Sequence, residues 1–216
     1  RRSLARADAR QFLVDPAGGW REATFTATDL LAADPVRLAR DLSERVERDP
    51  HAGWHARLRE AEDAHWDILA ACEERFEGGV LSAVVDALPD PATLFVSNSM
   101  PVRDLDRFGA PSLKDCTVLA NRGASGIDGV TSTALGAGSA TDEPLIAVTG
   151  DLAYFHDMNG LVALGRFGLD ATIVLLNNDG GGIFHGLPIA DFDPPFEAQF
   201  ETPHGLDFAP TGELYD

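Results

Sequence analysis

The sequence predicts an α/β fold with a parallel sheet flanked by helices, and two features of its second half support this prediction. Four short apolar runs have the composition of buried strands: residues 94–96, 118–120, 145–148 and 172–176. Helix-like stretches at 130–140 and 157–167 separate the last three of these runs. Short apolar strands that alternate with helices form a parallel sheet covered on both faces.

The first part of the chain has weaker signals. Residues 11–28 read as extended pieces, in which Thr and Phe alternate from Trp20 to Thr28. Asp34–Pro35 is a helix start, with Asp as the cap and Pro in the first turn. The apolar stripe expected on that helix consists of Leu38, Leu42 and Val46.

A second helix start follows at Asp49–Pro50 and precedes a longer amphipathic helix. The residues expected on its apolar face are Trp54, Leu58, Ala61, Ile68, Cys72 and Phe76. A short apolar helix over 80–88 then leads to a boundary near Pro89.

The charge balance excludes some classes of partner. Against 17 Lys and Arg the chain carries 35 Asp and Glu, a net charge of −18, which argues against binding to a nucleic-acid backbone. No apolar run approaches the ~18 residues that a membrane span needs. Two cysteines far apart, Cys72 and Cys116, provide no disulfide framework and suggest a reducing cytoplasm.

Lysine is almost absent, because Lys114 is the only one among the 17 basic residues. A carboxylate-rich, lysine-poor surface stays hydrated at high salt, where screening removes much of its self-repulsion. A salt-loving source therefore explains the composition. Replacement of Lys by Arg in a GC-rich genome explains it equally well.

Polar and glycine-rich segments follow each predicted strand, at the edge where α/β sheets bind ligands. They begin at Ser97, Asn121, Gly150 and Asn177. Asp151 and Asn178 carry oxygen ligands at the ends of consecutive strands, and glycines at 180–182 allow close approach of the backbone. This chemistry suits Mg²⁺ and a diphosphate. The alternative is that Asp151 caps a helix and Asn178 forms a turn.

The spacing favours the first interpretation. Gly150–Asp151–Leu152, then 24 residues, then Asn177–Asn178 resembles the signature of thiamine diphosphate enzymes. Leu152 stands where most members have Gly, and together with the segment 121–129 it resembles the branch of menaquinone biosynthesis. Ser97–Ser99 with Val102–Arg103 fits the same branch. The resemblance is dense over residues 90–190 and looser elsewhere.

The resemblance implies a domain organisation and a set of roles. Residues 1–50 would end a central α/β domain, 51–89 form a helical linker, and 90–216 form the diphosphate-binding domain of the thiamine diphosphate-binding fold. Mg²⁺ or Mn²⁺ would be bound by Asp151, Asn178 and the carbonyl of Gly180. The cofactor would contact these residues and Ile127, Gly150, Ile183, Phe184 and Leu187. Substrate carboxylates would meet Asn98, Ser99, Arg103 and Arg122.

The implied reaction decarboxylates 2-oxoglutarate and adds the succinyl-semialdehyde carbanion to isochorismate. In the family, a glutamate of a separate pyrimidine-binding domain activates the cofactor, and the active site lies between two subunits. No residue here corresponds to that glutamate, so the catalytic residue is unknown. We expect this chain to be part of a longer protein, truncated at its C-terminus, inactive alone and at least dimeric when complete.

Other interpretations stay open. The chain also fits another thiamine diphosphate carboligase, such as an acetolactate synthase, or a lineage that kept the fold and lost catalysis. A non-catalytic nucleotide-binding module is less compatible, because no G-x-G-x-x-G follows an early strand. The arginines could instead form ion pairs with Asp104, Asp106 or Asp128. His156 and His185 flank the expected site, whereas His204 is expected in a loop.

Overall fold

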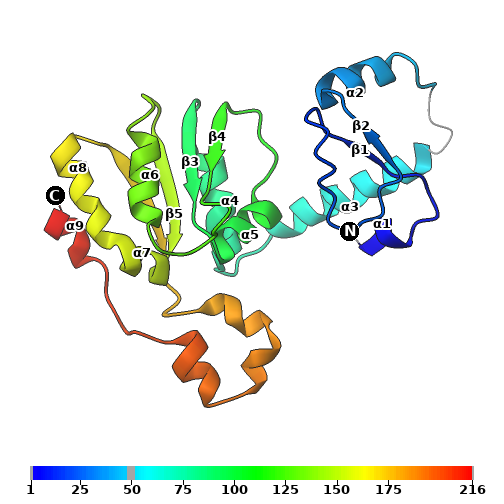
Figure 1. Cartoon of the computed structure of the whole chain (residues 1–216). Coiled ribbons are helices and arrows are strands. Elements are labelled where there is room, and N and C mark those ends of the chain that lie inside the picture. Colours follow the sequence, from blue (N-terminus) through cyan, green and yellow to red (C-terminus); the bar gives the residue numbers. More distant parts are fainter. Residues whose placement is uncertain (1, 48–51, 216) are drawn as a thin grey trace. The chain divides into compact units, whose positions relative to one another are not determined.

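The computed structural model describes residues 2–47 and 52–215, which belong to two compact units, Arg1–Ala61 and Glu62–Asp216. Figure 1 shows the elements of each unit. In the part of the chain that the structure describes, every helix is too short or too polar to span a membrane. The ligand-binding edge predicted from the sequence lies in the second unit.

The first unit contains a small parallel strand pair. Its elements are α1 (Arg2–Arg6), β1 (Phe12–Val14), β2 (Asp29–Leu31) and α2 (Pro35–Ser43). Helix α2 begins where the sequence predicts, because the Asp34 carboxylate accepts the backbone N–H of Arg37 at 2.8 Å. Val46 lies beyond the end of this helix, so the expected stripe is one residue shorter. The helix start expected at Asp49–Pro50 falls outside the described residues.

The extended segment expected over 20–28 is wrong. The carboxylate of Glu22 accepts the backbone N–H groups of Thr24, Thr26 and Ala27, so the chain curls around it instead of pairing as a strand. The hydroxyl of Thr24 is also a donor, and these hydrogen bonds lower the pKa of Glu22 to about 2.

The long amphipathic helix is shorter than the sequence predicts. Helix α3 (Ala52–Ala70) ends before Cys72 and Phe76, which therefore do not extend its apolar face. Trp54, Leu58 and Ile68 are exposed on this chain.

The second unit confirms the predicted parallel sheet. Its strands pair in the order β4-β3-β5-β6. They are β3 (Ala92–Val96), β4 (Cys116–Leu119), β5 (Leu145–Gly150) and β6 (Ala171–Leu176). Gly150 of β5 pairs with Leu176 of β6, so the two chain segments that follow these strands start at the same edge.

Helices cover both faces of this sheet. On one face lie α4 (Glu77–Ala87) and α5 (Met100–Phe108). On the other lie α6 (Val130–Gly138), α7 (Asp151–Asp157) and α8 (Val162–Phe167). Helix α7 begins directly at Asp151, six residues before the helix start expected at 157. A short 3₁₀ turn, Met158–Leu161, joins α7 to α8.

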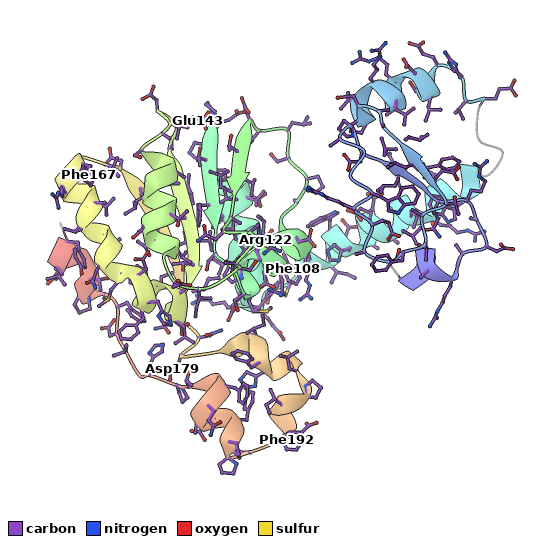
Figure 2. The ribbon with its side chains drawn as sticks, in the orientation of Figure 1. Phe108, Arg122, Glu143, Phe167, Asp179 and Phe192 are labelled. Atoms are coloured by element: carbon purple, nitrogen blue, oxygen red, sulfur yellow. The ribbon has the colours of Figure 1, made fainter. Side chains whose placement is uncertain are left out.

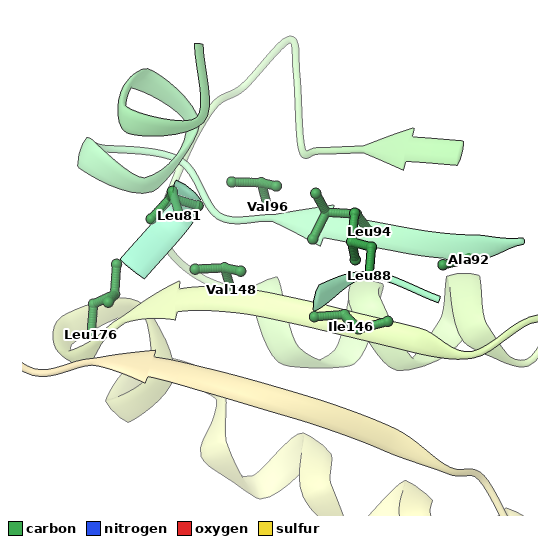
Figure 3. Packing of buried hydrophobic residues seen from close by; sticks show 8 residues of the cluster. All are labelled: Leu81, Leu88, Ala92, Leu94, Val96, Ile146, Val148 and Leu176. Carbon is green, nitrogen blue, oxygen red and sulfur yellow. The ribbon is translucent and has the colours of Figure 1, made fainter. Parts of the chain in front are cut away.

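The core follows the alternation of side chains along each strand. Leu94 and Val96 of β3 face α4 and α5, whereas Phe95 faces α6. Figure 3 shows the first cluster, in which Leu81 of α4 is completely buried against β3 and β5. Helix α4 falls in the segment 51–89 expected as a linker, yet it packs in the core of the second unit. The assignment of 1–50 to a central domain stays a prediction.

After β6 the chain leaves the sheet. It forms three short helical turns at Gly182–Gly186, Pro188–Asp191 and Glu197–Glu201. Figure 1 shows this stretch in orange, projecting from the carboxyl end of the strands. The chain then returns to α9 (Pro210–Tyr215) beside α8.

Lys114, the only lysine, holds the end of α4. Its ammonium donates to the carbonyls of Val85, Asp86 and Leu88 at 3.3, 2.6 and 2.8 Å. A cation at a helix C-terminus also interacts favourably with the helix dipole.

We expect Lys114→Met to lower the free energy of unfolding of this chain by about 1–3 kcal/mol, because three carbonyls lose a charged donor. Urea denaturation at fixed high salt measures the change. Arg75→Met, at an exposed side chain without an ion pair in the described residues, should change it by less than about 0.5 kcal/mol. Equal losses in both variants would assign the effect to net charge alone.

Candidate functional site

The ends of three sheet strands meet at one cavity of about 120 Å³. It lies at the carboxyl edge of the sheet, where α/β folds bind ligands. Figure 2 shows Arg122 and Asp179 toward this end, while Glu143, which precedes β5, lies at the opposite end. Nine of the residues expected in the site line the cavity: Asn98, Ser99, Ile127, Gly150, Asp151, Asn178, Gly180, Ile183 and Phe184. Arg103, Arg122 and Leu187 do not line it.

Asp151 is the most buried charged residue of this cavity, with 2% of its surface exposed. One carboxylate oxygen accepts the N–H of Leu152 at 2.7 Å, at the start of α7. The other accepts the N–H of Gly180 at 2.8 Å and lies 3.1 Å from His204 Nε2. The N-cap of α7 is Gly150, so the cap role considered for Asp151 is wrong. As the first residue of the helix, Asp151 accepts one N–H of its first turn and connects β5 to the glycine loop after β6.

Asn178 is oriented by a residue far away in the sequence. Its amide nitrogen donates to the Glu77 carboxylate at 2.7 Å, at the first residue of α4. The turn role considered for Asn178 belongs instead to Asn177, whose side-chain oxygen accepts the N–H of Asp179 at 3.1 Å. The amide oxygen of Asn178 thus stays available at the cavity.

The glycine loop lies against the backbone that ends the orange stretch. Gly181 donates its N–H to the carbonyl of Glu201 at 2.6 Å. Gly180 has a φ of +142°, and a Cβ placed on it would collide with that same carbonyl oxygen. Only glycine meets both requirements at position 180.

Asp179 closes the loop on its other side. Its carboxylate accepts the N–H of Gly205 at 2.7 Å and that of His204 at 3.0 Å. These two backbone donors lower the pKa of Asp179. The loop after β6 and the segment 202–206 are therefore connected at two neighbouring points.

The two expected substrate arginines lie on the rim. Arg103 donates to the carbonyl of Ser99 at 2.6 Å, and Arg122 donates to the side-chain oxygen of Asn98 at 3.3 Å. Asn98 is 3% exposed and also donates to the carbonyl of Gly126 at 2.7 Å. Among the described residues neither arginine forms an ion pair with a carboxylate, so the alternative of surface ion pairs finds no support there.

Asp104 is buried and lies near Glu77 rather than in an ion pair with Arg103. Burial raises the pKa of Asp104, the charge of Glu77 raises it further, and Arg107 partly offsets the shift. Glu77 and Asp104 border a shallow pocket beside Asn178. This end of the sheet therefore carries more negative charge than the sequence motifs alone indicate.

Two residues of the site were missed in the sequence. Glu77 accepts a hydrogen bond from Asn178, which lies 101 positions later in the sequence. His204 forms a hydrogen bond with Asp151, which lies 53 positions earlier. No local sequence pattern indicates hydrogen bonds between residues so far apart.

His156 and His185 do not line the cavity, and His185 lies 2.9 Å from the Glu201 carboxylate. Cys72 and Cys116 are free thiols, and burial raises the pKa of Cys116.

Several named synthases are similar to this chain over nearly its whole length. It is 64% identical over 217 aligned residues to the 2-succinyl-5-enolpyruvyl-6-hydroxy-3-cyclohexene-1-carboxylate synthase of Haloarcula marismortui, and 62% identical over 216 to that of Natronomonas pharaonis. These matches cover 100% of this chain and 36% of each relative. The synthase of Roseiflexus castenholzii is 48% identical over 206 residues, covering 94% of this chain and 35% of the relative.

A family match covers much of the second unit. Residues 111–214 match the thiamine pyrophosphate enzymes, in their C-terminal TPP binding domain. The match includes β4, β5, β6 and the glycine loop. The haloarchaeal sources of two relatives agree with a salt-loving source, one of the two explanations offered for the acidic composition.

The donor set fits the metal of a thiamine pyrophosphate enzyme. No group of three or more His, Cys, Asp or Glu side chains in the described ranges is arranged to hold a metal ion, so a cation here would depend on amide and carbonyl oxygens as well. One carboxylate, one amide and one backbone carbonyl at the same cavity are hard oxygen donors of the kind that Mg²⁺ prefers.

Ser97 supports a polar ligand in the same cavity. Its hydroxyl is buried at the end of β3 and has no hydrogen-bond partner among the described residues. Ser97 also lines the cavity. Burying a hydroxyl without a hydrogen-bond partner lowers the stability of the fold, and a polar ligand would supply the missing partner.

We expect Gly180→Ala to destabilise the second unit by about 1–3 kcal/mol, since the added methyl group collides with the Glu201 carbonyl. Chemical denaturation of this chain measures the loss. Gly186→Ala is the matched control in the same stretch, because a Cβ there meets nothing within 4 Å. If Gly180→Ala were as stable as Gly186→Ala, the close approach of the two backbones would be refuted.

Proposed function

We propose that the complete protein is a thiamine diphosphate- and Mg²⁺-dependent synthase of menaquinone biosynthesis. It would decarboxylate 2-oxoglutarate and add the resulting carbanion to isochorismate, giving 2-succinyl-5-enolpyruvyl-6-hydroxy-3-cyclohexene-1-carboxylate. The observation that carries this proposal is the cavity at the strand ends, which gathers most of the expected site residues on a chain 64% identical to a synthase of that name. The chain spans 36% of that relative's length.

The metal and the diphosphate would be held at the inner part of the cavity. Asp151 through its carboxylate, Asn178 through its amide oxygen and Gly180 through its carbonyl would bind Mg²⁺ or Mn²⁺. When bound, thiamine diphosphate accepts the electron pair released as a 2-oxo acid loses CO₂. The cation is needed because a diphosphate would otherwise meet the carboxylates of Asp151 and Glu77 without a counter-charge.

The apolar residues of the site would position the cofactor ring and exclude water. Ile127, Ile183 and Phe184 line the cavity beside the expected metal ligands. Leu187 follows on the orange stretch and is 49% exposed, so it would meet the ring or the substrate only in the assembled active site. Excluding water strengthens the electrostatic interactions that orient the substrate.

The substrate acids would be bound at the rim. Arg103 and Arg122 present guanidinium groups beside Asn98 and Ser99, and Arg offers a planar fork that matches carboxylate geometry. Both proposed substrates are multiply anionic, so two arginines without an ion pair among the described residues would form a local site for them in a chain of net charge −18. Neither a nucleic acid nor a membrane is a proposed partner.

The proposed active site is completed outside this chain. A cavity of about 120 Å³ is smaller than the roughly 300–1,000 Å³ of ordinary ligand pockets. A pyrimidine-binding domain of a second subunit would supply the remainder, including the glutamate that activates the cofactor. The working protein would be at least a homodimer in the cytoplasm.

The decisive experiment uses the complete gene product at high KCl with Mg²⁺, thiamine diphosphate and 2-oxoglutarate. We expect CO₂ release, and an adduct identified by mass spectrometry only when isochorismate is present. The present chain alone should release no CO₂, because it lacks the pyrimidine-binding domain. Consumption of a different 2-oxo acid would favour an acetolactate synthase-like carboligase, and full activity of the isolated chain would refute the two-domain site.

We expect Asp151→Ala in the complete protein to abolish Mg²⁺-dependent binding of thiamine diphosphate, because the one buried carboxylate among the proposed ligands is lost. Calorimetric titration of the cofactor with and without Mg²⁺ measures this directly. Asp191→Ala, on an exposed turn outside the cavity, is the control and should bind normally. Unchanged affinity in Asp151→Ala would overturn the metal assignment.

A further inference from the structure

His204 lies 53 positions after Asp151 in the sequence, yet its side chain contacts the Asp151 carboxylate at the centre of the site. Its Nε2 lies 3.1 Å from the Asp151 oxygen that also accepts the Gly180 N–H. The side chains are 12% exposed for His204 and 3% for Asp151, so this contact is shielded from water. Hydrogen bonds to a charged group in such surroundings are stronger than those on a surface.

The hydrogen bonds fix which ring nitrogen carries the proton. The backbone N–H of Leu206 donates to His204 Nδ1 at 3.0 Å, so Nδ1 is an acceptor. Nε2 therefore carries the hydrogen and donates it to Asp151. Nδ1 lies 3.3 Å from Asp179 as well, but it has no proton to donate there. With both nitrogens engaged, the ring has no lone pair left for a metal ion.

We propose that His204 is a positioning residue for the metal ligand Asp151, an inference that rests on the proposed function. The carboxylate is held by three donors: Leu152 on one oxygen, Gly180 and His204 on the other. The two backbone donors come from the chain next to the site, whereas His204 is the only side chain among them. It sets the carboxylate plane before a cation arrives, as outer hydrogen bonds do for metal ligands generally.

A second role must be separated from this one. His204 also anchors its own segment, through Leu206 to Nδ1 and through its backbone N–H to Asp179. A purely anchoring histidine would use Nδ1 and would not need Nε2. The two nitrogens can be tested one at a time, because a Gln side chain places its amide near Nε2 and an Asn side chain places its amide near Nδ1.

The test compares His204→Gln and His204→Asn in the complete protein. Free Mn²⁺, measured by its electron paramagnetic resonance signal, reports binding with saturating thiamine diphosphate and without turnover. We expect His204→Asn to raise the Kd for Mn²⁺ about tenfold to a hundredfold, the usual effect of losing an outer partner of a metal ligand. His204→Gln should stay within about threefold of the unsubstituted protein, since it keeps a donor toward Asp151.

Thermal unfolding of the cofactor-free proteins provides the second readout. His204→Gln gives up the Leu206 contact and should unfold at the lower temperature, whereas His204→Asn should bind metal more weakly. His185→Asn, at an exposed histidine of the preceding stretch, should leave metal binding unchanged.

Each remaining outcome contradicts one specific statement. Equal weakening of metal binding by the Gln and Asn variants would show an anchoring role and overturn the positioning role. Unchanged binding in His204→Asn would overturn it as well. If the unsubstituted complete protein binds neither Mn²⁺ nor thiamine diphosphate, the proposed function itself fails, independently of His204.

Discussion

A buried carboxylate without partners is among the most expensive groups a fold can contain, and the second unit is organised around one. Asp151 is enclosed at the edge of the sheet and is held by hydrogen bonds from three places in the chain. Its own helix provides Leu152, the loop after β6 provides Gly180, and the segment before α9 provides His204. Satisfying this single charge therefore fixes the path of two segments that have no regular structure of their own.

The distribution of positive charge would let an acidic chain hold the anionic ligands proposed for it. The only lysine lies away from the cavity, at the end of α4, where its ammonium donates hydrogen bonds to backbone carbonyls. At the strand ends the donors are backbone N–H groups and the guanidinium groups of Arg103 and Arg122. Backbone N–H groups and guanidinium groups form directional hydrogen bonds. High salt screens such short contacts much less than it screens the remaining surface charge.

The sequence predicted the parts of the structure that have local signals. Buried parallel strands are short apolar runs, so all four strands of the second unit were found within about two residues. The positions of Asp151 and Asn178 at the ends of consecutive strands predicted that they lie at one site, and both line the cavity. The prediction for 20–28 was wrong because the Glu22 side chain accepts backbone N–H groups that a strand would have used for pairing. Glu77 and His204 could not be predicted, because their contacts depend on the tertiary fold.

The loop between the glycines and His204 has a base closed by hydrogen bonds and an exposed tip. At the base, Gly181 bonds to Glu201 and Asp179 bonds to Gly205, so both ends of the loop are joined close to the expected metal ligands. The tip includes the exposed Phe192, 62% accessible on this chain. Since the base is closed by its own hydrogen bonds, a substitution at the tip can alter what lies against the loop without displacing Asp151.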